Sequence, residues 1–208
     1  MQKESVNMLN ETQLFQVQQE SPLAELGQLL APLTAGANQP VRLEEKPFLE
    51  LINIKGEAGS ASFLRAVKSL TGAALPLQPN TIAESEQFVI YWLAPNEWLI
   101  QSRQPRLPAL CADLAAALAG EFAAVVDVSS GNTSMVLSGI QARAVLQKGC
   151  PLDFHAGVFK PGQCAQSHYF KAGILLRPLD DGAFELIIRR SFADYFGRIL
   201  LDASQEYL

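Results

Sequence analysis

Short apolar stretches separated by turn residues recur along the chain and predict an internal repeat of strands and helices. The expected elements of the first copy are strand 48–54, a helix around 63–70, strands 81–85, 88–93 and 97–101, and helix 107–118. The second copy follows the same order, with strand 133–137, helix 142–146, strands 163–169, 174–179 and 184–188, and helix 192–200. In both closing helices the apolar residues return at helical spacing, which is typical of a helix that covers one face of a sheet.

The tight turns inside each copy set the fold class. Asn96 follows Pro95 in the first turn, and Gly182 follows two aspartates in the second; neither connection is long enough for a crossover, so the strands must be antiparallel. We therefore predict an α+β protein made of two ferredoxin-like strand–helix–strand–hairpin–helix units, with helices on one face of each sheet. A buried-looking strand, 122–128, joins the units, which we place at 41–120 and 121–208. Ser191 with Asp194 three residues later predicts a capping box for the last helix.

Residues 1–40 read as an N-terminal arm that carries one short helix. The first twenty residues are polar and aperiodic, and Ser21-Pro22 has the form of a helix start. A leucine stripe follows on one face of that helix, formed by Leu23, Leu26, Leu30 and Leu33. Such a stripe either folds back on its own domain or docks in the groove of a partner.

Composition and charge narrow the class of protein. The chain has 208 residues and a net charge of −5, with no basic run, so a nucleic-acid partner is not expected. No stretch reaches the roughly 18 apolar residues that a membrane span needs, and the polar N-terminus lacks the features of a secretion signal. Three cysteines are too few for a disulfide framework, which favours a cytoplasmic location.

Two cysteine–histidine pairs could in principle supply a thiol nucleophile with its base, or two metal ligands. They are Cys150 with His155 and Cys164 with His168. Both segments contain Pro or Gly or alternate like a strand, which prevents a shared helical face, and no further ligands cluster nearby. We expect packed cysteines beside ordinary histidines, and we assign no catalytic, cofactor-binding or metal-binding residue.

A few other polar and aromatic residues have both a structural and a functional interpretation. Asp127 ends an apolar strand, so its side chain either caps the following turn or lies in a pocket. Arg189 and Arg190, at the start of the last helix, could bind an anion, pair with carboxylates of a partner, or be solvated. Trp92 and Trp98 flank the first hairpin turn and form either a cross-strand contact or an interface patch. These two tryptophans and two arginines are our interface candidates.

Several motifs in one order resemble a known family. They include Val-Asp-Val-Ser at 126–129, Leu-Pro-Leu-Gln-Pro-Asn-Thr at 75–81, Lys-Gly-Cys-Pro-Leu-Asp at 148–153, Lys-Pro-Gly-Gln-Cys-Ala-Gln at 160–166 and Arg-Arg-Ser-Phe-Ala-Asp-Tyr at 189–195. Together with residues 92–99, these segments resemble the gamma subunit of heterotetrameric sarcosine oxidase over about 41–203. The Val-Asp-Val-Ser, strand, glycine, helix order is also similar to the aminomethyltransferase (T-protein) of glycine cleavage and its folate-binding relatives, which implies an aminomethyltransferase-like fold.

The resemblance implies that this chain carries out no catalytic step itself. In that family, the holoenzyme oxidises sarcosine to glycine and hydrogen peroxide and passes the one-carbon unit to tetrahydrofolate. The flavins (FAD and covalent FMN), NAD and tetrahydrofolate are held by other subunits, and the partners are larger alpha and beta subunits and a small delta subunit. This chain is then a structural subunit for assembly. The alternative is a stand-alone folate-binding protein or one-carbon transferase, in which Asp127, Arg177 and Arg189 would face the pterin or its glutamate tail.

Overall fold

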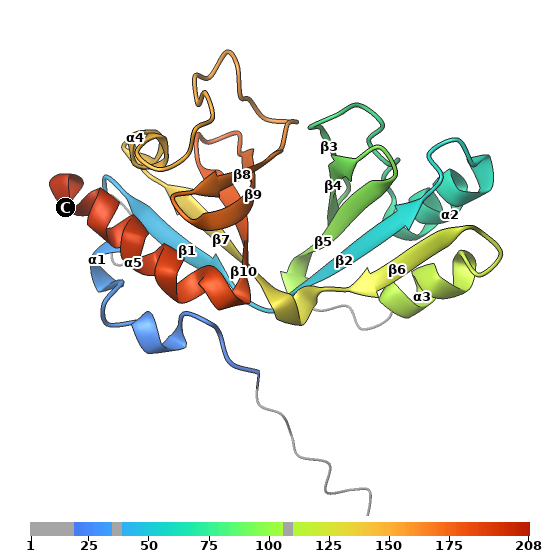
Figure 1. Ribbon diagram of the computed structural model, residues 1–208, viewed down its shortest axis with the longest axis horizontal. Coiled ribbons are helices and arrows are strands. Elements are labelled where there is room, and N and C mark those ends of the chain that lie inside the picture. The colour runs from blue at the N-terminus through green and yellow to red at the C-terminus, as the bar shows by residue number, and fades with distance from the viewer. Residues whose placement is uncertain (1–18, 35–38, 106–109) are drawn as a thin grey trace, which may run out of the picture.

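The computed structural model describes residues 19–34, 39–105 and 110–208. It confirms the predicted α+β class, since two five-stranded antiparallel sheets lie side by side (Figure 1). The first sheet has the order β3 (Ile82–Glu84), β4 (Phe88–Ala94), β5 (Glu97–Pro105), β2 (Leu49–Gly56) and β6 (Ala123–Asp127). Helices α2 (Ala61–Thr71) and α3 (Leu110–Ala117) pack on it, and the first three positions of the expected helix 107–118 lie outside the described residues.

The second sheet repeats this order and confirms the internal repeat. Its strands are β8 (Ala165–Tyr169), β9 (Ala172–Pro178), β10 (Phe184–Arg189), β7 (Asn132–Ser138) and β1 (Arg42–Lys46). Helices α4 (Ala142–Gln147) and α5 (Ala193–Ser204) cover its outer face. In both sheets a hairpin, β4–β5 or β9–β10, pairs with the strand that opens the same copy, β2 or β7.

Each sheet takes its fifth strand from the other copy. Strand β1 precedes the first copy in sequence but pairs with β7 of the second, with Leu43 opposite Leu137. Strand β6 precedes the second copy but pairs with β2 of the first, with Val125 opposite Ile54. The sheets therefore do not follow the predicted division at residue 120, because the chain crosses between them twice, at 47–48 and at 128–131 (Figure 1). We call this arrangement the reciprocal strand exchange.

Strand β1 is a structural element that the sequence pattern did not predict. Its sequence, Arg-Leu-Glu-Glu-Lys, contains one apolar residue, Leu43, and only that residue is buried. A strand at the edge of a sheet exposes one face and one edge to water, so a single inward leucine is enough to position it.

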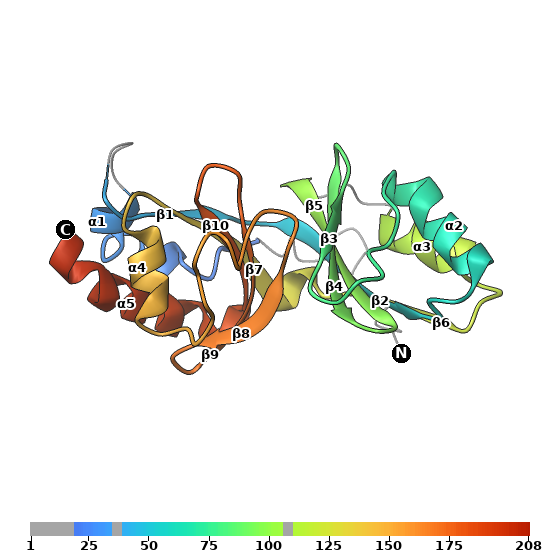
Figure 2. The same cartoon turned by 90° about the horizontal axis from the view of Figure 1, so that it is seen from above.

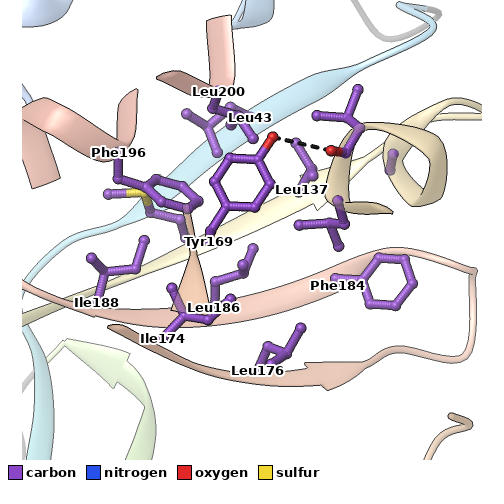
Figure 3. Close-up of a cluster of buried hydrophobic side chains, with 14 of the residues drawn as sticks. Leu43, Leu137, Tyr169, Ile174, Leu176, Phe184, Leu186, Ile188, Phe196 and Leu200 are labelled. Atoms are coloured by element: carbon purple, nitrogen blue, oxygen red, sulfur yellow. Dashed lines mark hydrogen bonds between the residues drawn. The ribbon is translucent and has the colours of Figure 1, made fainter. Parts of the chain in front are cut away.

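The core of the second sheet lies between the sheet and its helices. Leu43, Leu137, Leu186 and Leu200 converge there with the aromatic rings of Tyr169, Phe184 and Phe196 (Figure 3). Tyr169 is fully buried, and its hydroxyl donates a hydrogen bond of 3.0 Å to the carbonyl of Val145, which satisfies its polar end (Figure 3).

The leucine stripe of the N-terminal arm folds back on its own domain. Its four leucines belong to the core cluster of the second sheet, and the segment consists of a 3₁₀ turn (Ala24–Leu26) and a short helix, α1 (Ala31–Thr34). Three of these leucines lie over Gly197 of α5, where an added Cβ would come within 3.2 Å of Leu26 and 3.3 Å of Leu30. The absence of a side chain at Gly197 therefore makes room for the stripe.

The predicted capping box at the start of the last helix is wrong. Arg190–Phe192 form a 3₁₀ turn, and α5 begins afterwards with Phe192 as its N-cap and no capping side chain. Asp194 instead pairs with Arg198 one turn later, at 2.9 Å. Because the 3₁₀ turn places Ser191 before the helix proper, its hydroxyl is not at the capping position.

Candidate functional site

The two sheets meet through their inner faces, the faces that the helices leave uncovered. Apolar side chains from both sheets form one cluster at this junction: Leu51, Val89, Tyr91 and Leu99 from the first sheet and Cys164, Leu175 and Ile187 from the second. Figure 2 shows the sheets adjoining, with the helices at the far ends. The two copies therefore share an apolar contact.

A buried polar network lies within the same junction. The carboxylate of Glu185, on β10, accepts hydrogen bonds from the Gln101 side-chain amide of the first sheet and from the Ser134 hydroxyl at 3.0 Å. The hydroxyl of Tyr91 donates to the Gln101 amide oxygen at 2.6 Å and lies 3.3 Å from Glu185. All four residues are buried, so the network links the sheets where water cannot compete.

Arg177 completes this network with a cation. Its Nε donates to Glu185 at 2.7 Å, and its guanidinium also pairs with Glu84 of β3, which in turn pairs with Arg103 at 2.7 Å. Burial alone would lower the pKa of Arg177, but the nearby Tyr91 and Glu185 oxygens raise it, so the guanidinium stays charged. Burial raises the pKa of Tyr91, and the Glu185 carboxylate raises it further, so the phenol stays neutral.

A cavity of about 350 Å³ opens where the chain crosses between the sheets. Its lining comes from the arm, from the two crossings with the strand ends beside them, and from the 3₁₀ turn before α5: Gln19, Glu20, Pro22, Pro47, Phe48, Leu49, Glu50, Asp127, Ser129, Ser130, Asn132, Thr133 and Arg190. Two sequence candidates, Asp127 and Arg190, thus line one cavity. Asp127 fulfils both of its interpretations, since its carboxylate also accepts a 2.9 Å hydrogen bond from the Ser129 N–H and caps the turn.

The structure does not bring the cysteine–histidine pairs together. Cys150 contacts the Ser167 hydroxyl at 3.4 Å, and Cys164 contacts the carbonyls of Thr81 and Trp92. His155 accepts from the Gly157 N–H, while His168 contacts the carbonyl of Phe170. Burial raises the pKa of the Cys164 thiol to about 11, which is the opposite of what activates a nucleophile.

The four interface candidates occupy different environments. Trp98 is fully buried, and its ring packs at a tilt against Phe63, with the ring centroids 5.7 Å apart. Its indole N–H donates to the Pro76 carbonyl, so a partner chain cannot reach this residue directly. Trp92 lies opposite Trp98 on the neighbouring strand and is partly exposed. Arg189 and Arg190 are exposed at the end of β10 and the start of the following 3₁₀ turn.

Sequence reasoning missed most of the network, namely Tyr91, Gln101, Ser134, Glu185 and Glu84. Of its members only Arg177 was singled out, as a residue facing folate, and the structure places it against Glu185 instead of beside Asp127. A signal was present for Glu185, which is the single polar residue inside the apolar run 184–188 and must find a buried partner, whereas Gln101 begins the polar end of its strand.

Metal and membrane features are not found in the part of the chain that the structure describes. There, no group of three or more His, Cys, Asp or Glu side chains is placed to hold a metal ion. Nor does any helix among those residues have the length and apolarity to cross a membrane.

Comparison with known proteins identifies the family. The sequence model for the sarcosine oxidase gamma subunit family matches residues 55–206. Sarcosine oxidase subunit gamma of Corynebacterium sp. strain P-1 is 31% identical over 189 residues, which is 90% of each chain. The protein of the same name from Corynebacterium sp. strain U-96 is 27% identical over 202 residues, which is 96% of this chain and 97% of that one.

Solved structures agree with the sequence comparison. A chain of the heterotetrameric sarcosine oxidase from Corynebacterium sp. U-96, in complex with pyrrole 2-carboxylate, matches with a TM-score of 0.83 and 27% identity, over 91% of this chain and 96% of that one. The glycine cleavage system aminomethyltransferase T from Bartonella henselae matches with a TM-score of 0.64 and 17% identity, over 88% and 57%, and so shares the fold. The chain belongs to the sarcosine oxidase gamma subunit family.

Proposed function

We propose that this chain is the gamma subunit of a heterotetrameric sarcosine oxidase and serves it as a structural subunit for assembly. The observation that carries the proposal is the match, over nearly the whole length of both chains, to one chain of a heterotetrameric sarcosine oxidase. The chain's own polar residues support it, since the buried residues Gln101, Ser134, Arg177 and Glu185 form a network that holds the two sheets together.

The chemistry of the oxidase belongs, in this proposal, to the other subunits. The larger alpha and beta subunits and the small delta subunit are the partners, and the alpha and beta subunits hold FAD, covalent FMN, NAD and tetrahydrofolate. The complex oxidises sarcosine to glycine and hydrogen peroxide and transfers the one-carbon unit to tetrahydrofolate.

The exposed arginines are the proposed contacts of this chain with a partner. Arg189 and Arg190 lie side by side where β10 meets the last helix, and Arg190 also lines the cavity. A planar guanidinium suits bidentate pairing with a carboxylate of a neighbouring subunit. Trp92, partly exposed on the first hairpin, extends the proposed set, while Trp98 supports it from within by fixing that hairpin.

The comparisons do not favour the alternative function, a stand-alone folate-binding protein or one-carbon transferase. The aminomethyltransferase likeness is one of fold at 17% identity, whereas the relatives over 90% or more of the chain are gamma subunits. The residues proposed to face folate are also separated, since Asp127 lines the cavity while Arg177 is buried in the network.

The direct test is co-expression of the full chain, carrying an affinity tag, with the alpha, beta and delta subunits encoded by the same host. Native mass spectrometry should detect a four-chain assembly with flavin absorbance, and sarcosine-dependent hydrogen peroxide release should require the large subunits. A chain that stays alone, or that binds folate in a titration of the isolated protein, would contradict the proposal.

The role of the arginines is tested in the same assembly. Arg189→Ala and Arg190→Ala, together, should weaken co-purification of the large subunits while leaving the fold of this chain unchanged. Arg198→Ala is the matched control, because Arg198 is an exposed arginine on α5 that pairs with Asp194 of its own helix. Equal recovery of the partners from all three proteins would remove the arginines from the proposed interface.

A further inference from the structure

The edges of the two sheets are built differently from one another. An exposed edge strand presents unpaired N–H and C=O groups and can recruit a foreign strand, so proteins protect such edges with charge, bulges or cover. Strand β1, an edge of the second sheet, carries four charged residues among its five, and Glu44 pairs with both Arg42 and Lys46. This edge is protected by charge.

The edges formed by β3 and β8 are protected in other ways. Strand β3 is short and is covered by the 161–163 segment, since the Ile82 N–H donates to the Gly162 carbonyl at 3.0 Å. Strand β8 directs polar side chains outward, and Gln166 reaches across to the Leu93 carbonyl of the first sheet at 2.8 Å.

Strand β6 is the exception among the four edges of the described sheets. It reads Ala-Ala-Val-Val before its terminal Asp127, so its first four residues carry no charge. Val126 is 50% exposed, and Phe122, immediately before the strand, is 96% exposed. An uncharged edge flanked by a fully exposed phenyl ring lacks the usual protection against pairing.

The backbone of β6 offers hydrogen bonds to a further strand. The Val128 N–H donates to the Leu51 carbonyl at 2.9 Å, so the register pairs Val126 and Ala124 with β2 through hydrogen bonds. Antiparallel geometry then turns the N–H and C=O of Val125 away from β2, toward the open edge. An extended peptide can pair with this donor and acceptor through its own backbone.

The backbone that carries the exposed phenyl ring is fixed by hydrogen bonds in the turn before β6. The Ala123 N–H donates to the Glu121 carbonyl at 2.9 Å, and the Glu121 N–H donates to the Leu118 carbonyl at 2.9 Å. The Glu121 carboxylate accepts a 2.9 Å hydrogen bond from Ser60, the N-cap residue of α2. Phe122 is therefore presented to solvent by an anchored backbone, which lowers the entropic cost of using it in a contact.

We propose that the β6 edge, from Phe122 to Val126, is a docking edge that receives an extended, uncharged segment of another subunit of the oxidase. The segment adds a sixth strand to the first sheet beside β6, and the Phe122 ring enters an apolar recess of the same partner. This inference rests on the proposed function, because it takes the partner to be a subunit of the same heterotetramer. The absence of charge along β6 selects an uncharged partner strand, since a buried charge there would be unpaired.

The test uses the co-expressed four-chain assembly with the double variant Phe122→Ser, Val126→Lys. A lysine on the edge strand is expected to reduce recovery of the large subunits on the tagged chain by about tenfold or more. The matched control is His168→Lys, which adds a lysine at an exposed position of the edge strand β8 and should retain the partners. Phe122→Ser alone is a second variant that cannot disturb packing, because the ring is 96% exposed.

Hydrogen exchange gives a readout that needs no substitution. The Val125 amide should exchange at least about tenfold more slowly in the assembly than in the isolated chain, because it becomes hydrogen-bonded. Unchanged exchange, or full partner recovery with the double variant, would overturn the docking edge while leaving the proposed function intact. A homodimer of the wild-type chain that the double variant abolishes would assign the edge to a second copy instead. If the wild-type chain captures no partner, the proposed function itself fails.

Discussion

At the scale of single residues, the three thiols show how burial decides reactivity. Cys150 and Cys164 are buried, whereas Cys111, on α3, is partly exposed. Burial raises the pKa of Cys111, and the nearby carboxylates of Asp127 and Glu50 raise it further. Because only the thiolate attacks an alkylating agent, Cys111 and Cys164 should react slowly, and burial further limits access to Cys150 and Cys164.

We therefore predict an order of alkylation in the folded chain. With iodoacetamide at pH 8, Cys111 should be modified first, and Cys164, whose pKa is raised to about 11, should hold only about one thousandth of its thiol as thiolate. The alkylation rate of Cys164 should rise about tenfold per pH unit until the pH reaches the pKa of this thiol. Peptide mass spectrometry after timed quenching measures each site, with the urea-unfolded chain as control; early modification of Cys164 would contradict the burial that the structure shows.

Residue identity alone allowed some of these features to be predicted. Asp127 was recognised because it is the one acid at the end of an apolar strand, and the turn it caps is local in sequence. The partners of Glu185 could not be predicted in the same way, because Gln101 and Ser134 approach it from strands 84 and 51 residues away in the chain. Which buried polar groups meet is decided by sheet packing.

At the scale of elements, periodicity predicted most strands and helices, and it was weakest at their ends. The leucine stripe in residues 19–34 and the hairpins were identified because their side chains alternate or repeat on one face. The start of α5 was misplaced because a 3₁₀ turn precedes it, and β1 was missed because only Leu43 is buried. Both errors occur where local pattern carries little information about tertiary contacts.

The N-cap of α2 provides a prediction at this scale. Ser60 accepts from the Phe63 N–H at 3.2 Å and donates to Glu121, so Ser60→Ala should lower the free energy of unfolding by about 1 kcal/mol. Urea unfolding at pH 7 measures this loss, with Ser60→Thr, which keeps the capping hydroxyl, as the control.

The loss of stability caused by Ser60→Ala should depend on pH, and the direction of that dependence can be stated. Hydrogen bonds from Ser62 and Ser60 hold the pKa of Glu121 below its ordinary value, so their stabilisation is present above that value and is lost as the pH falls through the lowered pKa. The difference in the free energy of unfolding between wild type and Ser60→Ala should therefore become smaller as the pH falls. A difference that widens between pH 5 and pH 3 would contradict the role of Glu121.

The packing of the arm on α5 gives a second prediction for an element. Gly197→Leu should displace the leucine stripe, because even a Cβ at this position is within 3.3 Å of Leu26 and Leu30. Limited proteolysis should then cleave within residues 19–34 faster than in wild type, while the strands remain protected. Gly59→Leu is the control, since a Cβ there meets nothing within 4 Å.

At the scale of the whole molecule, the two sheets are held by an apolar cluster with a charged network beside it. Removing one member of a buried ion pair leaves the other charge uncompensated, whereas removing both costs less. Arg177 and Glu185, each 8% exposed in the side chain, are the central pair. The network therefore specifies how the sheets align, and the apolar cluster that includes Leu51 and Ile187 holds them together.

We predict that Arg177→Met lowers the free energy of unfolding by about 3–5 kcal/mol. The double variant Arg177→Met, Glu185→Gln should be more stable than Arg177→Met alone, because the glutamine keeps hydrogen bonds to Gln101 and Ser134 without a buried charge. Chemical denaturation of the four proteins of this cycle measures the coupling. Strictly additive losses would contradict a direct interaction between the two side chains.

The reciprocal strand exchange has a consequence for how the chain acquires its structure during synthesis. The β1–β7 pairing joins Leu43 to Leu137, and the first copy receives β6 only after residue 127 has been made. Residues 49–127 contain every strand of the first sheet, so that sheet can form before the rest of the chain has emerged from the ribosome. Strand β1, in contrast, emerges first and stays without its partner until β7 has been made, and this long-range pairing slows completion of the second sheet. During that interval the unpaired β1 segment is exposed, and a chaperone or a partner subunit that binds early can keep it from pairing with other chains.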